Sequence, residues 1–218
     1  MDSSPHRGEV RPKGGEGVGD PTAVLLHGAT ADGATWAGFA ERLTERGWQV
    51  TTPDLRGGTL EEMAAGLLSG VPAGPDLAIG HSLGGAVLLT ALDRLQPRQA
   101  VYADPAWRFE LSADRQSAGR RFLTTATRDQ WRRMLPRLSD RDLDAFIAAA
   151  AKWDFEGPAQ VDMVPGRPPT VPSLILLSRE LGYDVPGYQV VRLHGVGHFM
   201  FWEDPDQCLQ AIEDFVAG

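Results

Sequence analysis

Short apolar runs and amphipathic stretches alternate along most of this chain. The runs are rich in Val, Ile, Leu and Ala, which is typical of strands buried on both faces. In the stretches between them the apolar residues recur at helical spacing, and Trp36, Phe39 and Leu43, for example, fall on one face. The pattern predicts strands at Thr22–Leu26, Trp48–Thr52, Leu77–Gly80, Ala100–Ala103, Val171–Leu177 and Gln189–Leu193. It predicts helices at Trp36–Arg46, Leu60–Leu68, Leu83–Leu95 and Asp206–Val216.

This alternation of strand and helix indicates crossover connections, because each strand is followed by a helix before the next strand begins. Crossovers produce parallel strands with helices packed on both faces of the sheet. We therefore expect an α/β fold with an open, mostly parallel sheet of about six strands.

The alternation stops in the segment 105–170, where only helical patterns are evident. The expected helices are 114–125, 129–135 and 140–153, and no convincing strand is found there. We expect residues 22–104 and 171–218 to form the core and 105–170 to be a helical insertion. Residues 1–21 are rich in Gly, Pro and charge, which predicts a flexible leader.

Composition and charge narrow the class of protein. A length of 218 residues favours a single domain, and 42% hydrophobic with 23% charged residues is typical of a globular protein. The net charge of −8 argues against a nucleic acid or an anionic membrane as partner. With no long apolar stretch for a membrane span or signal peptide, we expect a cytoplasmic protein. The single cysteine, Cys208, supports neither an intrachain disulfide nor a multi-cysteine metal site.

The motif that points most directly to chemistry is Gly80-His81-Ser82-Leu83-Gly84, which fits G-x-S-x-G between a predicted strand and a predicted helix. A serine on such a sharp turn adopts a strained backbone conformation, and small neighbours let the chain close around it. The turn presents the hydroxyl at the carboxyl end of the sheet, where open α/β folds place their sites. We predict that Ser82 is a nucleophile.

A serine hydroxyl needs a base within hydrogen-bonding reach. The chain offers five histidines, at positions 6, 27, 81, 194 and 198. His198 is the preferred base because it follows a flexible Gly195-Val196-Gly197 loop just beyond a strand. His194, at the end of that strand, is expected to be structural or exposed. His27, after the first strand, is expected to be structural and to bond loop backbone.

Acyl transfer also needs N–H groups that bind the negative oxygen of the tetrahedral intermediate. The N–H of Leu83, at the positive end of the predicted helix, is one natural donor. The loop after the first strand supplies the other candidate, the N–H of Ala29, because Gly28 permits the necessary turn.

These motifs, with Pro53-Asp54-Leu55-Arg56-Gly57, Asp104-Pro105 and Gly197-His198-Phe199 in the same chain order, resemble the α/β-hydrolase superfamily. The resemblance covers about residues 22–104 and 171–217. It implies that the insertion is a helical cap over Ser82. It also implies a triad acid, for which the family usually has an Asp after the strand predicted at Val171–Leu177.

The acid has more than one candidate, because that loop reads Ser178-Arg179-Glu180-Leu181-Gly182-Tyr183-Asp184. We prefer Glu180, which lies closer to the strand end. Asp184 and Asp104 remain alternatives, since some family members take the acid from the position of Asp104. The family's usual Gly-x-Gly-x-Ser turn after the second strand is also absent, because Arg56-Gly57-Gly58-Thr59 leads directly into a helix.

Together these residues predict a serine hydrolase that forms an acyl-enzyme on a carboxylic ester, lactone or thioester with a hydrophobic acyl part. Trp107 and Trp153 are expected in the core of the cap, or else lining the acyl pocket. No metal or organic cofactor is expected. The expected partner is a small-molecule substrate, and the expected oligomeric state is a monomer or homodimer. The alternatives are a hydroxynitrile-lyase-like lyase and a natural-product cyclase. The lyase is disfavoured because such lyases use a lysine close to the catalytic histidine, and the only lysines of this chain are Lys13 and Lys152.

Overall fold

The computed structural model describes residues 19–29, 31–110, 117, 121, 125–135, 138–151 and 160–218. Six parallel strands form one sheet in the order β2-β1-β3-β4-β7-β8. The strands are β1 (Thr22–Leu26), β2 (Gln49–Thr51), β3 (Leu77–His81), β4 (Gln99–Ala103), β7 (Ser173–Leu177) and β8 (Gln189–Arg192). The helices of the core are a 3-10 turn η1 (Gly33–Trp36), α1 (Ala37–Thr44), α2 (Leu60–Gly70), α3 (Leu83–Leu95), α7 (Met200–Glu203) and α8 (Pro205–Ala217). The open, parallel α/β sheet predicted from the sequence is confirmed.

The insertion differs from its prediction in one respect. It contains α5 (Arg128–Met134) and α6 (Asp140–Ala151), close to two of the predicted helices, but also an antiparallel strand pair, β5 (Arg108–Glu110) and β6 (Gln160–Asp162). The expectation that this segment lacks strands is therefore wrong. Each of the two strands has three residues with only the middle one facing the interior, so no apolar run marks them in the sequence.

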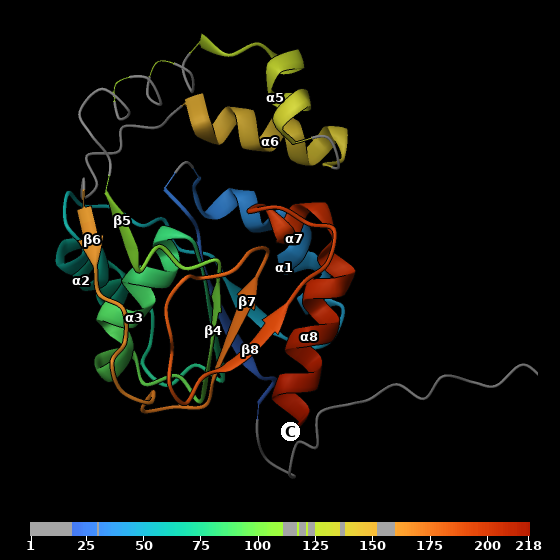
Figure 1. Cartoon of the computed structure of the whole chain (residues 1–218). Coiled ribbons are helices and arrows are strands. Elements are labelled where there is room, and N and C mark those ends of the chain that lie inside the picture. Colours follow the sequence, from blue (N-terminus) through green and yellow to red (C-terminus); the bar gives the residue numbers. More distant parts are fainter. Residues whose placement is uncertain are drawn as a thin grey trace, which may run out of the picture.

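Successive side chains of the buried strands pack on opposite faces of the sheet, which divides the core into two apolar clusters. In β1, for example, Leu25 packs into one apolar cluster and Leu26 into the other. The first cluster is completed by residues of α1, α7 and α8, and the second by residues of α2 and α3. Successive side chains of a strand point to opposite faces, so strands that are apolar throughout need helices on both sides. Figure 1 shows this three-layer arrangement.

Helices α5 and α6 lie together at one end of the sheet, above α1 and α7 (Figure 1). Their inner side chains Trp131, Leu143 and Phe146 belong to the same apolar cluster as one face of the sheet. The Phe146 ring meets the Phe199 ring edge-on at 5.0 Å between centroids. This part of the insertion is thus packed onto the core rather than standing apart from it.

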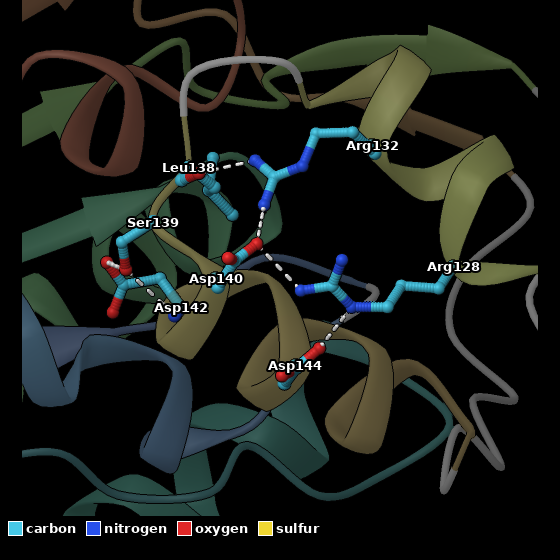
Figure 2. Close-up of polar contacts among 7 residues, drawn as sticks. All are labelled: Arg128, Arg132, Leu138, Ser139, Asp140, Asp142 and Asp144. Carbon is cyan, nitrogen blue, oxygen red and sulfur yellow. Dashed lines mark hydrogen bonds and ion pairs between the residues drawn. The ribbon is translucent and has the colours of Figure 1, made fainter.

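A polar network on the outer side joins α5 to α6 (Figure 2). Arg128 bonds Asp140 at 2.7 Å and Asp144 at 2.8 Å, and Arg132 reaches the same oxygen of Asp140 at 2.5 Å. Ser139 caps the start of α6 by accepting from the N–H of Asp142. Because these groups are largely exposed to solvent, each pair contributes little stability alone, and the network chiefly fixes how the two helices pair.

No helix in the described part of the chain is long and apolar enough to cross a membrane.

Candidate active site

The turn between β3 and α3 holds Ser82 in a strained conformation. Its backbone angles are φ 53° and ψ −117°, which a residue with a side chain rarely adopts. The strain is held from both sides, because the Ser82 N–H donates to the carbonyl of Ala103 at 2.9 Å, and the Ser82 carbonyl accepts from the N–H of Ala106 at 2.9 Å. A conformation of this kind costs about 1–3 kcal/mol and persists where neighbouring structure enforces it.

The glycines around Ser82 are required by close backbone contacts. A Cβ on Gly80 would lie 2.5 Å from the carbonyl oxygen of Gly84, and a Cβ on Gly84 would lie 2.3 Å from that of Leu26. A Cβ on Gly85 would meet Pro105 at 3.0 Å. The first turn of α3 therefore approaches the ends of β1 and β3 closely enough to exclude any side chain, as predicted from the small residues of the motif.

The loop after β1 lies against this turn. A Cβ on Gly28 would be 3.2 Å from the Cβ of Ser82, so the loop and the serine are neighbours. His27 fixes the loop, because its Nδ1–H donates to the Gly28 carbonyl at 2.8 Å while its Nε2 accepts from the N–H of Leu55 at 2.9 Å. Burial lowers the pKa of His27 and keeps its ring neutral. The expectation that His27 bonds loop backbone is confirmed.

The two predicted oxyanion donors flank this contact. Ala29 is in the loop after β1, and Leu83 is the first residue of α3, where an N–H has no partner within its own helix. In the described part of the chain, neither N–H donates a hydrogen bond to another residue. Both groups thus remain available as donors.

His198 reaches the site on the loop between β8 and α7. Its Nδ1 lies 3.2 Å from Oδ2 of Asp104, and since a carboxylate only accepts, Nδ1 carries the proton. Its carbonyl oxygen lies 2.7 Å from Nε2 of His81, the residue before Ser82. The N–H of Gly197 donates to Glu203 at 2.9 Å. This loop, residues 193–199 (the histidine loop), is therefore tied to the turn at Ser82 (the elbow), to Asp104 and to α7.

Asp104 directly follows β4, the strand next to β3, and its carboxylate is buried. Besides His198, it accepts from the N–H of Ser178 at 2.9 Å and from the Ser178 hydroxyl. Burial alone would raise the pKa of Asp104, but the hydrogen bonds from His198 and Ser178 outweigh it and hold the pKa below its usual value. Asp104 is thus a carboxylate that can orient the imidazole.

The structure does not bring Glu180, the preferred acid, to His198. Its carboxylate is exposed and lies 3.2 Å from Nη1 of Arg192 on β8. Asp184, the second alternative, lies further along the same loop, in a surface hollow lined by Glu180, Leu181 and Arg192. The chain turns outward after Ser178, whose own hydrogen bonds fix the strand end to Asp104. Of the three carboxylates, the geometry places Asp104 beside the histidine.

Asp104 directly follows β4, a sequence signal for the acid that was outweighed by the expectation of an acid after β7. Its φ of 41° lies in the left-handed region, which Asp tolerates better than most residues, and Pro105 follows directly. A carboxylate at the end of the strand adjacent to the elbow is brought near the serine by sheet topology alone.

The predicted aromatic residues separate into different environments. Trp107 is fully buried beside Tyr102 and donates its Nε1–H to the Gly85 carbonyl at 3.3 Å, so it belongs to the core below α3. Trp153, the other residue considered for an acyl pocket, lies outside the described residues. His194 is exposed, and its backbone is held by the Gln207 side chain. Among the described residues, no cluster of His, Cys, Asp and Glu is arranged to hold a metal ion.

The sheet order, the nucleophile-elbow geometry and the order of the motifs define an α/β-hydrolase architecture. The sequence pattern of the alpha/beta hydrolase family matches residues 23–211, and the chain belongs to this family. A comparison with curated proteins found no match.

Several solved structures are similar over nearly their whole length. An esterase from Exiguobacterium antarcticum has a TM-score of 0.69 at 14% identity, covering 92% of this chain and 93% of that one. An esterase from Rhodococcus sp. ECU1013 has a TM-score of 0.68 at 16% identity, covering 91% of each chain. A thermophilic esterase from Thermogutta terrifontis has a TM-score of 0.62 at 22% identity, covering 91% of this chain and 90% of that one. At such identities the likeness concerns the fold.

Replacing Gly84 with Ala tests the close approach of α3 to β1. The added methyl would overlap the Leu26 carbonyl, which is backbone and cannot move aside, so we expect a loss of about 3 kcal/mol in unfolding free energy. Gly66→Ala is the matched control, since a Cβ there meets only the Arg56 carbonyl oxygen at 3.8 Å, at an exposed position of α2. It should stabilise the protein by about 0.5–1 kcal/mol. Urea unfolding measures both, and equal effects would contradict the contact.

The burial of His81 predicts a pH dependence of stability. Burial, followed by the proximity of His198, lowers the pKa of His81 from 6.5 to about 3. Between these values the unfolded chain binds a proton at this residue and the folded chain does not, so stability falls as pH decreases, by at most about 1.4 kcal/mol per unit. Urea unfolding at pH 6.5 and 4.5 should show a larger loss for the native protein than for His81→Gln. Equal losses would mean that His81 titrates normally.

Proposed function

We propose that the protein is a serine hydrolase that cleaves a carboxylic ester, lactone or thioester with a hydrophobic acyl part. The observation that carries this proposal is the grouping of three residues: Ser82 after β3, Asp104 after the adjacent β4, and His198 bonded both to Asp104 and to the residue before the serine. Membership of the alpha/beta hydrolase family supports hydrolytic chemistry at this place.

The hydrogen-bond pattern assigns the roles in catalysis. Nδ1–H of His198 is directed to Asp104, so Nε2 has the lone pair that takes the proton from the Ser82 hydroxyl. Ser82 Oγ then attacks the substrate carbonyl carbon, forming the tetrahedral intermediate. Its collapse breaks the bond to the alcohol or thiol, which leaves with the proton returned by His198. Water, activated by the same histidine, hydrolyses the acyl-enzyme and releases the carboxylic acid.

The N–H groups of Ala29 and Leu83 are the proposed oxyanion donors. They come from the loop after β1 and from the first residue of α3, which meet across the contact of Gly28 with Ser82. The Leu83 donor gains from its place at the positive end of a helix of 13 residues. Each well-placed donor of this kind contributes on the order of 3 kcal/mol to stabilising the transition state.

The hydrophobic acyl part is supported by the aromatic residues beside the histidine. Phe199 follows His198 directly, with ring centroids 5.5 Å apart, and Phe146 of α6 packs on Phe199. We extend the proposal to the insertion 105–170 as a lid over Ser82, with α6 above the histidine loop. Among similar structures, an N-acyl homoserine lactonase was solved with N-hexanoyl homoserine, at 19% identity and a TM-score of 0.57.

Covalent labelling tests the nucleophile. The native protein should gain the mass of one fluorophosphonate adduct at Ser82, and Ser82→Ala should gain none. The variant should also lose hydrolysis of p-nitrophenyl esters by about 10⁴-fold or more. An acetate-to-laurate series reports the preferred acyl length. Labelling of Ser82→Ala would refute the assignment. Labelling of the native protein without any ester hydrolysis would favour a lyase or a cyclase. A cyclase would be recognised by a product that retains the mass of the substrate.

Paired substitutions test the acid. Asp104→Asn preserves size and some hydrogen bonding but removes the charge that orients His198, so we expect kcat to fall by about 10³-fold or more. Glu180→Gln and Asp184→Asn should each stay within about twofold of the native kcat, because neither side chain reaches the histidine. Steady-state kinetics on one p-nitrophenyl ester decides the question. A large loss in Glu180→Gln with none in Asp104→Asn would restore the acid preferred from the sequence.

A further inference from the structure

His81, the residue before the serine, has no role in the proposed chemistry and yet occupies the centre of the site. It ends β3, and 2% of its surface is exposed. Its ring lies 4.7 Å from the His198 ring and 5.4 Å from the Trp202 ring, centroid to centroid. On another side, Nδ1 would lie 3.2 Å from a Cβ on Gly28. The imidazole thus fills the space between the elbow, the loop after β1 and the histidine loop.

The hydrogen bonding of His81 fixes its tautomer. Nε2 lies 2.7 Å from the carbonyl oxygen of His198, and since a carbonyl only accepts, Nε2 carries the proton. Nδ1 is buried and has no hydrogen-bond partner among the described residues. Leaving a buried nitrogen unpaired costs about 1–3 kcal/mol. A leucine or methionine would fill the same space without this cost, but it would lack the donor at Nε2.

We infer that His81 is a positioning residue: its Nε2–H holds the peptide of His198 against the elbow, so that the His198 imidazole, bonded to Asp104, keeps the position from which it would act on Ser82. The catalytic part of this inference rests on the proposed hydrolase function. The contact is made to the carbonyl of His198, so it fixes the position of the backbone of that residue. The bond to Asp104 fixes the orientation of its ring.

The need for such a contact follows from the surroundings of His198. Its side chain is 38% exposed, and within the described part of the chain its ring bonds one other side chain, that of Asp104, at 3.2 Å. The loop that carries it has glycines at 195 and 197, and Gly195 has a φ of 71°. A shift of about 1 Å between reacting groups can cost on the order of 100-fold in rate. A direct bond from the residue adjacent to Ser82 keeps the two groups in one rigid frame.

The side-chain amides of Gln and Asn separate this role from simple packing. In the His81→Gln variant the amide nitrogen of the new side chain reaches about as far as Nε2, so it retains a donor to the His198 carbonyl. The shorter side chain of His81→Asn reaches only the position of Nδ1. Both variants remove the imidazole and keep a neutral amide, and they differ mainly in whether the donor reaches the carbonyl. His194→Gln makes the same replacement at an exposed residue of the same loop as His198 and is the control.

Kinetics on p-nitrophenyl butyrate and the rate of fluorophosphonate labelling form the first arm of the test. In His81→Asn we expect kcat and the labelling rate to fall by about 10- to 100-fold with KM within about threefold. His81→Gln should recover most of that loss, and His194→Gln should match the native protein. Equal losses in the Asn and Gln variants, or a change confined to KM, would overturn the positioning role.

Nuclear magnetic resonance forms the second arm and needs no activity. In ¹⁵N,¹³C-labelled protein, a scalar coupling should connect Nε2 of His81 with the carbonyl carbon of His198. The Nδ1 proton of His198 should exchange faster with solvent in His81→Asn than in His81→Gln or in the native protein. Absence of the coupling overturns the inference. Its presence in a protein that fluorophosphonate does not label would refute the hydrolase proposal while leaving the structural contact standing.

Discussion

The close approach of the first turn of α3 to the ends of β1 and β3 is the constraint on which the rest of the site depends. The carbonyl oxygens of Leu26 and Gly84 occupy the space that side chains at positions 84 and 80 would need. This close approach requires a sharp bend of the chain at Ser82. The bend is then bonded on both sides to the segment that ends β4 and follows it. That same segment contains Asp104, so the strain at the serine and the placement of the carboxylate have a common origin.

Three histidines near this bend illustrate how environment assigns different tasks to one residue type. Among the described residues, His27 bonds backbone groups of two loops, and His81 joins the elbow to the histidine loop while being almost completely buried. His198 alone among the three combines a carboxylate partner with substantial exposure. Burial lowers the pKa of the first two and keeps them neutral, so that they act as fixed hydrogen-bonding groups.

The sequence was sufficient for those features that follow from local periodicity and short motifs. The six strands of the sheet and the elbow at Ser82 arise from apolar runs and from glycines at fixed offsets, which are visible along the chain. The strands β5 and β6 were not predictable in this way, because their pairing is a contact between segments far apart in the sequence with no apolar run. The acid is a similar case. Asp104 and Glu180 both follow strands of the sheet, and the choice between them depends on the hydrogen bonds of Ser178 and on strand order.

The packing of α6 has a consequence for how substrate preference in such a protein can change. Phe146 belongs to the apolar cluster of the sheet and also touches Phe199, the neighbour of His198. Residues on the inner surface of this helix therefore cannot be exchanged without also disturbing the segment that carries the imidazole. In the proposed hydrolase, selectivity set by this helix and turnover are therefore mechanically linked, and substitutions that alter one should be found together with compensating changes on the opposing aromatic rings.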